Sequence, residues 1–238
     1  MPLEIIEKDV FKTFCNSVPY KSFMQSNEMA ELLSKRGYQV AYLGFKDQGQ
    51  LQVAAILFSL PMTWGLHMEI NSGPVSRDKR YLKAFYQELQ TYAKENGALE
   101  LLVKPYDTYQ QFDTDGKPTD QEQTALLEDF LSLGYQHDGL LTGYPGGEPD
   151  WHYLKDLTDL DDKSLLKSFS KKGRPLVKKA KTFGITLRKL DREELPLFKE
   201  ITSATSDRRD YMDKSLEYYQ DFYDSFGDSC EFMVASLN

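Results

Sequence analysis

The chain is poor in the residues that most often carry nucleophilic or metal chemistry, with three histidines and two cysteines among 238 residues. His67, His137 and His152 have no zinc-ligand spacing, so we do not expect a zinc site. Cys15 and Cys230 lie far apart among apolar residues, which is typical of reduced, buried thiols in the cytosol. Neither a Ser-His-Asp nor a Cys-His catalytic arrangement is evident, and no general base can be named.

Long hydrophobic runs are also lacking. The longest, residues 53–60, is far shorter than the roughly 18 apolar residues of a membrane-spanning helix, so we interpret it as a buried strand. The N-terminus is charged within its first eight residues and has no apolar stretch before a cleavage site, which excludes a signal peptide. At 40% hydrophobic, the chain is long enough to bury a sizeable core, and we expect a cytoplasmic globular protein.

The charge is distributed unevenly. The formal net charge is −8, yet residues 163–192 hold eleven Lys or Arg residues and one acid, so this segment carries +10. Such asymmetry predicts a localised polyanion site, although a solvated helix face is the usual explanation of a charge run. The candidate anion-binding residues are Lys171, Lys172, Arg174, Lys178, Lys179 and Lys181.

A helix break is expected inside this basic segment. Gly173 interrupts the helical pattern, and Pro175 suits the first turn of a new helix, whose N–H groups and dipole favour phosphate. We expect the apolar residues to face inward while the cations face out, and they are Leu165, Leu166, Phe169, Leu176, Val177, Ala180 and Phe183.

The first 150 residues alternate between helical and strand periodicity, which predicts a mixed α/β domain. Helices are expected over residues 11–18 and after a cap at Ser26, and three consecutive strands, residues 40–45, 51–60 and 66–70, form an antiparallel meander. An amphipathic helix, a strand and a third helix should follow, at residues 82–92, 99–103 and 126–131.

The turn-rich residues 143–151, GYPGGEPDW, predict a boundary between a domain at 1–150 and a second unit at 151–238. In the second unit we expect a short strand at 153–157, the basic helices, a strand at 185–190, a helix at 193–205 and a helix capped by Asp213. The last strand, residues 230–237, is expected to have no partner, so the chain is expected to be incomplete at its C-terminus.

Three segments carry motifs of one known family in the same order. SFSKKGRPLVKKAKTFGITLRKL has a Ser-Lys-x-x-Arg start, a basic helix ending in Lys-Ala-x-x-x-Gly, and a strand. FKEITSATSDRRDYMDKSLEYYQDF places Lys214 four positions before Tyr218 in a Glu-Tyr-aromatic triplet, and SFMQSNEMAELLSKRGYQ contains a Gln-Ser helix start. Together they resemble the Fem family of peptidoglycan bridge-forming aminoacyltransferases, above all its MurN-like streptococcal members.

The resemblance implies an enzyme that transfers an amino acid, alanine in the MurN-like members, from charged tRNA to the stem-peptide amine of a peptidoglycan precursor. The implied partners are aminoacyl-tRNA and lipid II or its UDP-linked soluble equivalent, with a peripheral approach to the inner membrane face, no DNA and no cofactor. The implied α/β fold is two acetyltransferase-like (GNAT) domains, of which residues 1–150 would form the first and 151–238 the N-terminal part of the second.

Site residues follow where positions match the family's motifs. Lys214 and Tyr218 are implied to contact the precursor, although lysine lacks the bidentate fork of the arginine that is frequent in the family. Lys35 or Arg36 is expected to replace a family lysine in a phosphate contact, and Lys104 at a strand end is a further candidate. Tyr218 also lies at helical spacing from aromatic residues, a pattern typical of core packing.

Two other functions stay open on the sequence. An acyl-CoA-dependent N-acetyltransferase would have the same fold, but the chain lacks the Gly-rich strand-to-helix turn that holds the cofactor's pyrophosphate. A non-enzymatic RNA-binding module is supported only by the basic segment.

Overall fold

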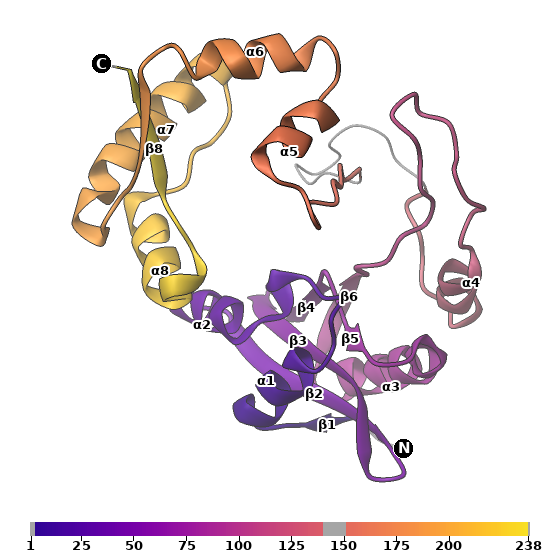
Figure 1. Cartoon of the computed structure of the whole chain (residues 1–238). Coiled ribbons are helices and arrows are strands. Elements are labelled where there is room, and N and C mark those ends of the chain that lie inside the picture. The colour runs from indigo at the N-terminus through magenta and orange to yellow at the C-terminus, as the bar shows by residue number, and fades with distance from the viewer. Residues whose placement is uncertain (1–2, 140–150, 238) are drawn as a thin grey trace. The chain divides into compact units, whose positions relative to one another are not determined.

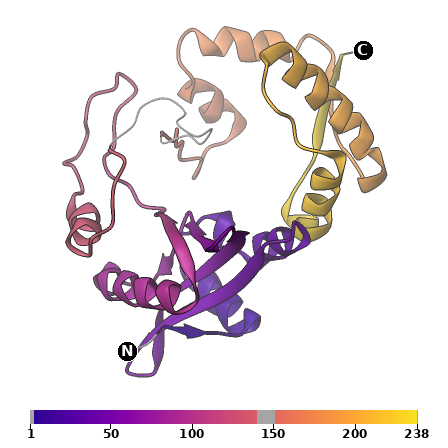
Figure 2. The same cartoon turned by 180° about the vertical axis from the view of Figure 1, so that it is seen from behind.

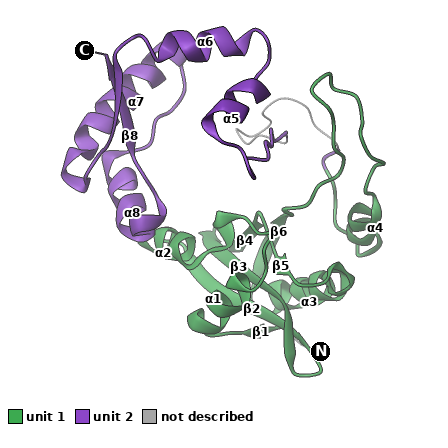
Figure 3. Ribbon diagram, in the orientation of Figure 1, with its two compact units in different colours: residues 1–137 green, residues 138–238 purple. Residues whose placement is uncertain are grey.

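The computed structural model describes residues 3–139 and 151–237. The chain divides into two compact units, Met1–His137 (unit 1) and Asp138–Asn238 (unit 2), which Figure 3 shows in green and purple. The predicted boundary at residues 143–151 lies, except for Trp151, outside the described residues. The division into domains at 1–150 and 151–238 therefore stays a prediction.

Unit 1 is built around a mixed sheet with the strand order β1-β2-β3-β4-β6, in which β5 pairs with β3 (Figure 1). Its strands are β1 (Glu4–Ile5), β2 (Gln39–Asp47), β3 (Gln50–Met62), β4 (Gly65–Asn71), β5 (Val75–Ser76) and β6 (Ala98–Lys104). Its helices are α1 (Lys8–Asn16), α2 (Asn27–Lys35), α3 (Leu82–Glu95) and α4 (Ala125–Ser132), with short 3-10 turns at Phe23–Gln25 and Lys79–Tyr81.

The sequence accounts for the topology of this sheet. Gln48 and Gly49 both have positive φ, the conformation that a tight hairpin requires, so β2 and β3 pair antiparallel. β4 pairs antiparallel with β3, whereas α3 carries the chain back so that β6 lies parallel to β4. The predicted meander, the helix after it and the strand at 99–103 are confirmed, and with them the mixed α/β class.

Helices cover both faces of the sheet, as the opposite views in Figures 1 and 2 show. Adjacent residues of a strand point to opposite faces. Accordingly, Tyr42 packs on Phe11 of α1, with ring centroids 5.1 Å apart, while Leu43 belongs to the buried cluster that includes Phe85 and Leu89 of α3. The predicted buried strand is confirmed, because the β3 side chains from Val53 to Phe58 are all buried.

Gln25 joins two strands to the start of α2. Its side chain is 1% exposed, accepts a hydrogen bond from the Ile56 N–H of β3 (2.8 Å) and donates one to the Asn71 carbonyl at the end of β4 (2.7 Å). The hydroxyl of the next residue, Ser26, accepts from the Met29 N–H and caps α2 (3.2 Å), which confirms the predicted cap. The Gln-Ser motif therefore has a structural role in this chain.

Unit 2 contains helices α5 (Asp162–Ser168), α6 (Gly173–Ala180), α7 (Leu195–Arg209) and α8 (Leu216–Phe226), the strands β7 (Ile185–Lys189) and β8 (Met233–Leu237), and short 3-10 turns at Arg192–Glu194 and Gly227–Ser229. Leu190, Leu195, Phe232 and Val234 form its buried cluster, against which aromatic residues of α7 and α8 pack. Because β8 pairs antiparallel with β7, the expectation that the last strand has no partner is wrong.

Two further expectations about unit 2 are wrong. Residues 153–157 form no strand, and Tyr153 and Leu154 are 100% and 85% exposed, so their apolar character does not reflect burial in a sheet. The cap of α8 is Ser215, whose hydroxyl accepts from the Tyr218 N–H (3.1 Å), rather than Asp213. The Asp213 carboxylate is used in tertiary contacts instead.

Candidate functional site

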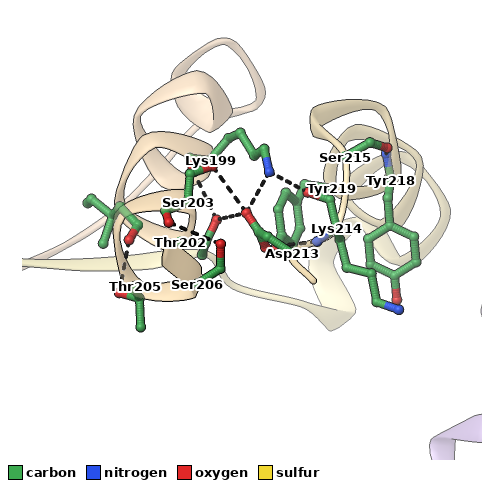
Figure 4. Close-up of polar contacts among 11 residues, drawn as sticks. Lys199, Thr202, Ser203, Thr205, Ser206, Asp213, Lys214, Ser215, Tyr218 and Tyr219 are labelled. Carbon is green, nitrogen blue, oxygen red and sulfur yellow. Dashed lines mark hydrogen bonds and ion pairs between the residues drawn. The ribbon is translucent and has the colours of Figure 1, made fainter. Parts of the chain in front are cut away.

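Asp213 lies at the centre of a polar network between α7 and α8 (Figure 4). Its side chain is 8% exposed, and its Oδ2 lies 2.5 Å from Lys199 Nζ. The same oxygen accepts a hydrogen bond from the Thr202 hydroxyl (2.9 Å), while Oδ1 accepts from the Tyr219 hydroxyl (2.7 Å). A sheltered carboxylate with this many donors is stabilised in its charged form.

The electrostatics of the network follow from these contacts. The Lys199 ammonium, followed by the hydroxyls of Tyr219 and Thr202, holds the pKa of Asp213 far below its usual range. Burial and then the Asp213 carboxylate raise the pKa of Tyr219, so the phenol stays protonated and donates. Sequence reasoning missed this network, since its members are separated along the chain and carry no common motif.

The network fixes the backbone of Lys214. The Lys214 N–H donates to Asp213 Oδ1 (2.8 Å), and the Lys214 carbonyl accepts from Lys199 Nζ (2.7 Å). The side chain is exposed, and Nζ lies 5.5 Å from the centroid of the Tyr218 ring, within cation–π range. Figure 4 shows the two side chains running alongside each other, away from the Asp213 carboxylate. The structure thus brings this predicted pair together.

The Tyr218 ring contacts both an aromatic side chain and a cation. The half-buried ring contacts Phe222 of the same helix, with centroids 6.3 Å apart, and also the Lys214 ammonium. The packing alternative therefore describes one contact of the ring, and the Lys214 ammonium is another.

The six candidate anion-binding residues lie on and around α6. Their lysines are exposed, and none of the six side chains forms an ion pair with a carboxylate of the described residues. Lys179 Nζ lies 5.4 Å from the Phe183 ring centroid. Arg174 differs from the lysines, because its Nε and Nη2 donate to the carbonyls of Phe169 (2.9 Å) and Lys167 (2.5 Å) and so hold the turn between α5 and α6.

The start of α6 offers fewer free backbone N–H groups than expected. A helix does begin at Gly173, but the N–H groups of Gly173 and Arg174 both donate to the Ser170 carbonyl (3.0 and 3.1 Å), and Pro175 has none. Fewer backbone donors are therefore left for a phosphate than the helix break predicts. The lysine ammonium groups are the main cationic feature of this segment.

The apolar residues of the basic segment do not face inward as expected. Leu176 is 67% exposed, Phe183 50% and Phe169 38%, and none of the seven residues expected to face inward belongs to a buried cluster of the described residues. α5 and α6 are short and lie outside the aromatic cluster of α7 and α8, so they have no layer to pack on in the part of unit 2 that the structure describes.

The candidates of unit 1 lie on different elements. Lys35 pairs with Glu31 in α2 (3.2 Å), and Arg36 stacks on the Tyr38 ring (5.5 Å), both at the exposed end of that helix. Lys104 ends β6 and pairs with Glu69 of β4 (3.1 Å), so its charge is already balanced. We find no group of His, Cys, Asp and Glu that could hold a metal ion within residues 3–139 and 151–237.

Comparisons with known proteins agree on one family. Residues 6–238 match the family model described as FemAB family. The chain is 30% identical over 223 residues to aminoacyltransferase FemB of Staphylococcus epidermidis. The aligned region covers 92% of this chain and 54% of that protein. It is 29% identical over 234 residues to aminoacyltransferase FemA of Staphylococcus aureus, and the aligned region covers 96% of this chain and 56% of that protein.

The fold has a solved counterpart. A crystal structure described as FemX superposes on 100% of this chain and 58% of its own, with a TM-score of 0.76 at 23% identity, which shows a shared fold. The chain spans about half the length of the curated relatives it matches. Among the described helices, none has the length and apolar character that crossing a bilayer requires.

Proposed function

We propose, from the premise that the chain belongs to the FemAB family, that it acts in transferring an amino acid from aminoacyl-tRNA to the stem-peptide amine of a peptidoglycan precursor. The observation that carries the proposal is the family match over residues 6–238, with relatives named aminoacyltransferases. The Lys214–Tyr218 pair and the exposed lysines of α6 support the two substrate contacts that this reaction needs.

The donor contact is proposed for α6. A tRNA acceptor arm presents closely spaced phosphates, and lysines without an ion pair among the described residues attract them at long range. Lys171, Lys172, Lys178, Lys179 and Lys181 supply this charge, whereas Arg174 contributes mainly by holding the turn from which α6 starts.

The acceptor contact is proposed for the start of α8. Lys214 offers an ammonium for the pyrophosphate of the precursor, and Tyr218 offers a ring face and a hydroxyl for the adjoining sugar or peptide. The Asp213 network pre-organises Lys214, because it fixes the backbone of this residue before any ligand arrives. Less ordering on binding means that more of the contact energy appears as affinity.

The proposed reaction needs no covalent enzyme intermediate, because the aminoacyl ester is already activated. The neutral acceptor amine attacks the ester carbonyl, the C–N bond forms, and the C–O bond to the tRNA ribose breaks. The amine loses a proton, and the departing ribose oxygen gains one. The enzyme's work is to hold the amine against the carbonyl and to stabilise the oxyanion. We assign neither step to a named residue.

The finer identity of the substrates is part of the same proposal. We propose alanine as the donated amino acid and lipid II or its UDP-linked soluble form as the acceptor. Charged tRNA is made in the cytoplasm, so the proposed site of action is the cytoplasm, with a peripheral approach to the inner membrane face when the acceptor is lipid-linked.

The test is incorporation of radiolabelled alanine from alanyl-tRNA into a purified UDP-linked muropeptide by the enzyme. We expect incorporation that requires both substrates and stops when either is omitted. Transfer of an acetyl group from acetyl-CoA to the same acceptor would replace the proposal with an N-acetyltransferase. Tight tRNA binding without any transfer would instead favour an RNA-binding module.

A further inference from the structure

A small cavity in unit 1 opens at the carboxyl ends of β4 and β6, the only parallel strand pair within the described part of the chain. Residues 73–76 follow β4 and residues 105–107 follow β6, and members of both segments line the cavity. The two strand ends are joined by the Gly73 N–H, which donates to the Lys104 carbonyl (3.2 Å). In open α/β sheets, ligands bind where successive connections diverge beyond the carboxyl ends of the strands.

The size of the cavity limits what it can hold. Its volume is about 70 Å³. One water needs about 10–15 Å³ on the same measure, so the cavity has room for roughly five to seven atoms of that size. An alanyl group with its ester oxygen matches this volume, and a larger group would extend beyond it.

One polar group on the cavity wall has unused capacity. The Asp107 side chain is 22% exposed, and its Oδ1 accepts from Lys79 Nζ (2.6 Å) and from the Thr108 N–H (2.9 Å). Its Oδ2 makes no hydrogen bond or ion pair with any residue in 3–139 or 151–237. Lys79 is 74% exposed, so that pair contributes little energy and leaves the carboxylate able to bind a second cation.

The rest of the wall is partly polar, with Ser76, Lys79 and Tyr106, and partly apolar. Leu82 and Tyr86 of α3 are 7% and 1% exposed, and Leu126 of α4 packs against the same core cluster. Burial, followed by Tyr135 and Asp107, raises the pKa of Tyr86, so its phenol stays neutral beside a ligand. The cavity therefore combines the Asp107 carboxylate, which has one oxygen in the ion pair with Lys79, with an apolar side formed by Leu82, Tyr86 and Leu126.

We propose that this cavity holds the aminoacyl group of the donor, with its α-ammonium on Asp107 Oδ2 and its small side chain against Leu82 and Leu126. The inference rests on the proposed function and adds the residues that select the donor. An α-amino acid with a small side chain satisfies the carboxylate and fills the cavity, whereas a larger side chain does not enter.

The first test compares binding of alanyl-tRNA with that of N-acetylalanyl-tRNA, in which acetylation removes the ammonium charge. We expect the enzyme to bind alanyl-tRNA about tenfold more tightly, because one charge-assisted hydrogen bond is at stake. Asp107→Asn should reduce that preference to below about twofold while leaving the affinity for N-acetylalanyl-tRNA unchanged. An undiminished preference in Asp107→Asn would overturn the proposal.

The second test changes the volume. Leu126→Ala should let larger aminoacyl groups, such as valyl-tRNA, compete with alanyl-tRNA in the transfer assay, and the matched control is Leu131→Ala at a 53% exposed position of the same helix. If the wild type transfers alanine but neither Asp107→Asn nor Leu126→Ala changes donor selection, only the cavity assignment fails. If the wild type neither binds nor uses charged tRNA, the proposed function fails as well.

Discussion

Lys199 and Asp213 form an ion pair of 2.5 Å in which the same ammonium also donates to the backbone carbonyl of Lys214 (2.7 Å). The pair is more than a helix-to-helix contact, because it fixes the residue proposed to bind the precursor. The carboxylate holds the Lys214 N–H and the ammonium holds the Lys214 carbonyl. The backbone position of Lys214, just before α8, therefore depends on a residue in the first half of α7.

Replacing Asp213 by asparagine should destabilise the protein, with an effect that depends on pH. The pKa of Asp213 is depressed in the folded state, so its contribution is complete above the unfolded value of about 4 and is lost as pH falls toward the folded value. The stability difference between wild type and Asp213→Asn, measured by urea unfolding, should therefore be larger at pH 7 than at pH 3. Asp210→Asn, at an exposed position of the same loop, is the control. A difference that grows on acidification would contradict the assignment.

Replacing Lys214 by alanine should weaken precursor binding about tenfold, the cost of one charge-assisted contact, and change tRNA affinity by less than about twofold. Isothermal titration with a UDP-linked muropeptide and a filter-binding assay with tRNA measure the two affinities. Lys8→Ala, at an exposed position of α1, should alter neither. An equal loss of both affinities would mean that Lys214 only supports the structure.

Reversing two charges on α6 should weaken tRNA binding and flatten its dependence on salt. If Lys178 and Lys179 each contact one phosphate, the double variant Lys178→Glu/Lys179→Glu should reduce the slope of log K against log salt by about 1.4 to 1.8. Lys94→Glu, at an exposed site near the end of α3, is the matched control. An unchanged slope in the double variant would remove α6 from the tRNA contact.

Replacing Gln25 by leucine should destabilise unit 1 by about 1–3 kcal/mol, because the buried Ile56 N–H loses its hydrogen-bond partner without gaining water. Chemical denaturation followed by circular dichroism gives this value. Gln87→Leu, on the exposed side of α3, should cost less than about 0.5 kcal/mol. Equal effects of the two substitutions would show that the Gln25 hydrogen bonds contribute no net stability.

Local pattern predicted unit 1 better than unit 2. Helix 82–92 carries a regular periodicity whose apolar stripe became the buried face, and the continuous apolar run within 51–60 became a strand buried on both faces. In unit 2, residues 153–157 have strand-like side chains but no neighbouring strand, and pairing partners do not appear in local sequence. The partner of β8 is β7, more than forty residues earlier, and no local signal identifies it.

The candidate site was predictable only where a motif carried it. Lys214 and Tyr218 were implied by the resemblance to the Fem family's motif. In the structure the first turn of α8 and the residue before its cap do place the two side chains together. Asp107 and Asp213 were missed because their significance comes from tertiary neighbours: a cavity wall for Asp107, and Lys199 and Tyr219 for Asp213. The residues next to a carboxylate in the sequence do not indicate whether more distant donors will surround it in the fold.

The Gln25–Ser26 dipeptide has a consequence for genetics. Gln25 bridges two strands, and the adjacent Ser26 caps a helix. All of these hydrogen bonds lie within unit 1. Under the proposed function, alleles altered at either position should behave as loss-of-function mutations in a screen for cell-wall defects, through lowered protein abundance. Lower growth temperature should rescue them, whereas it would not restore alleles that remove a substrate contact.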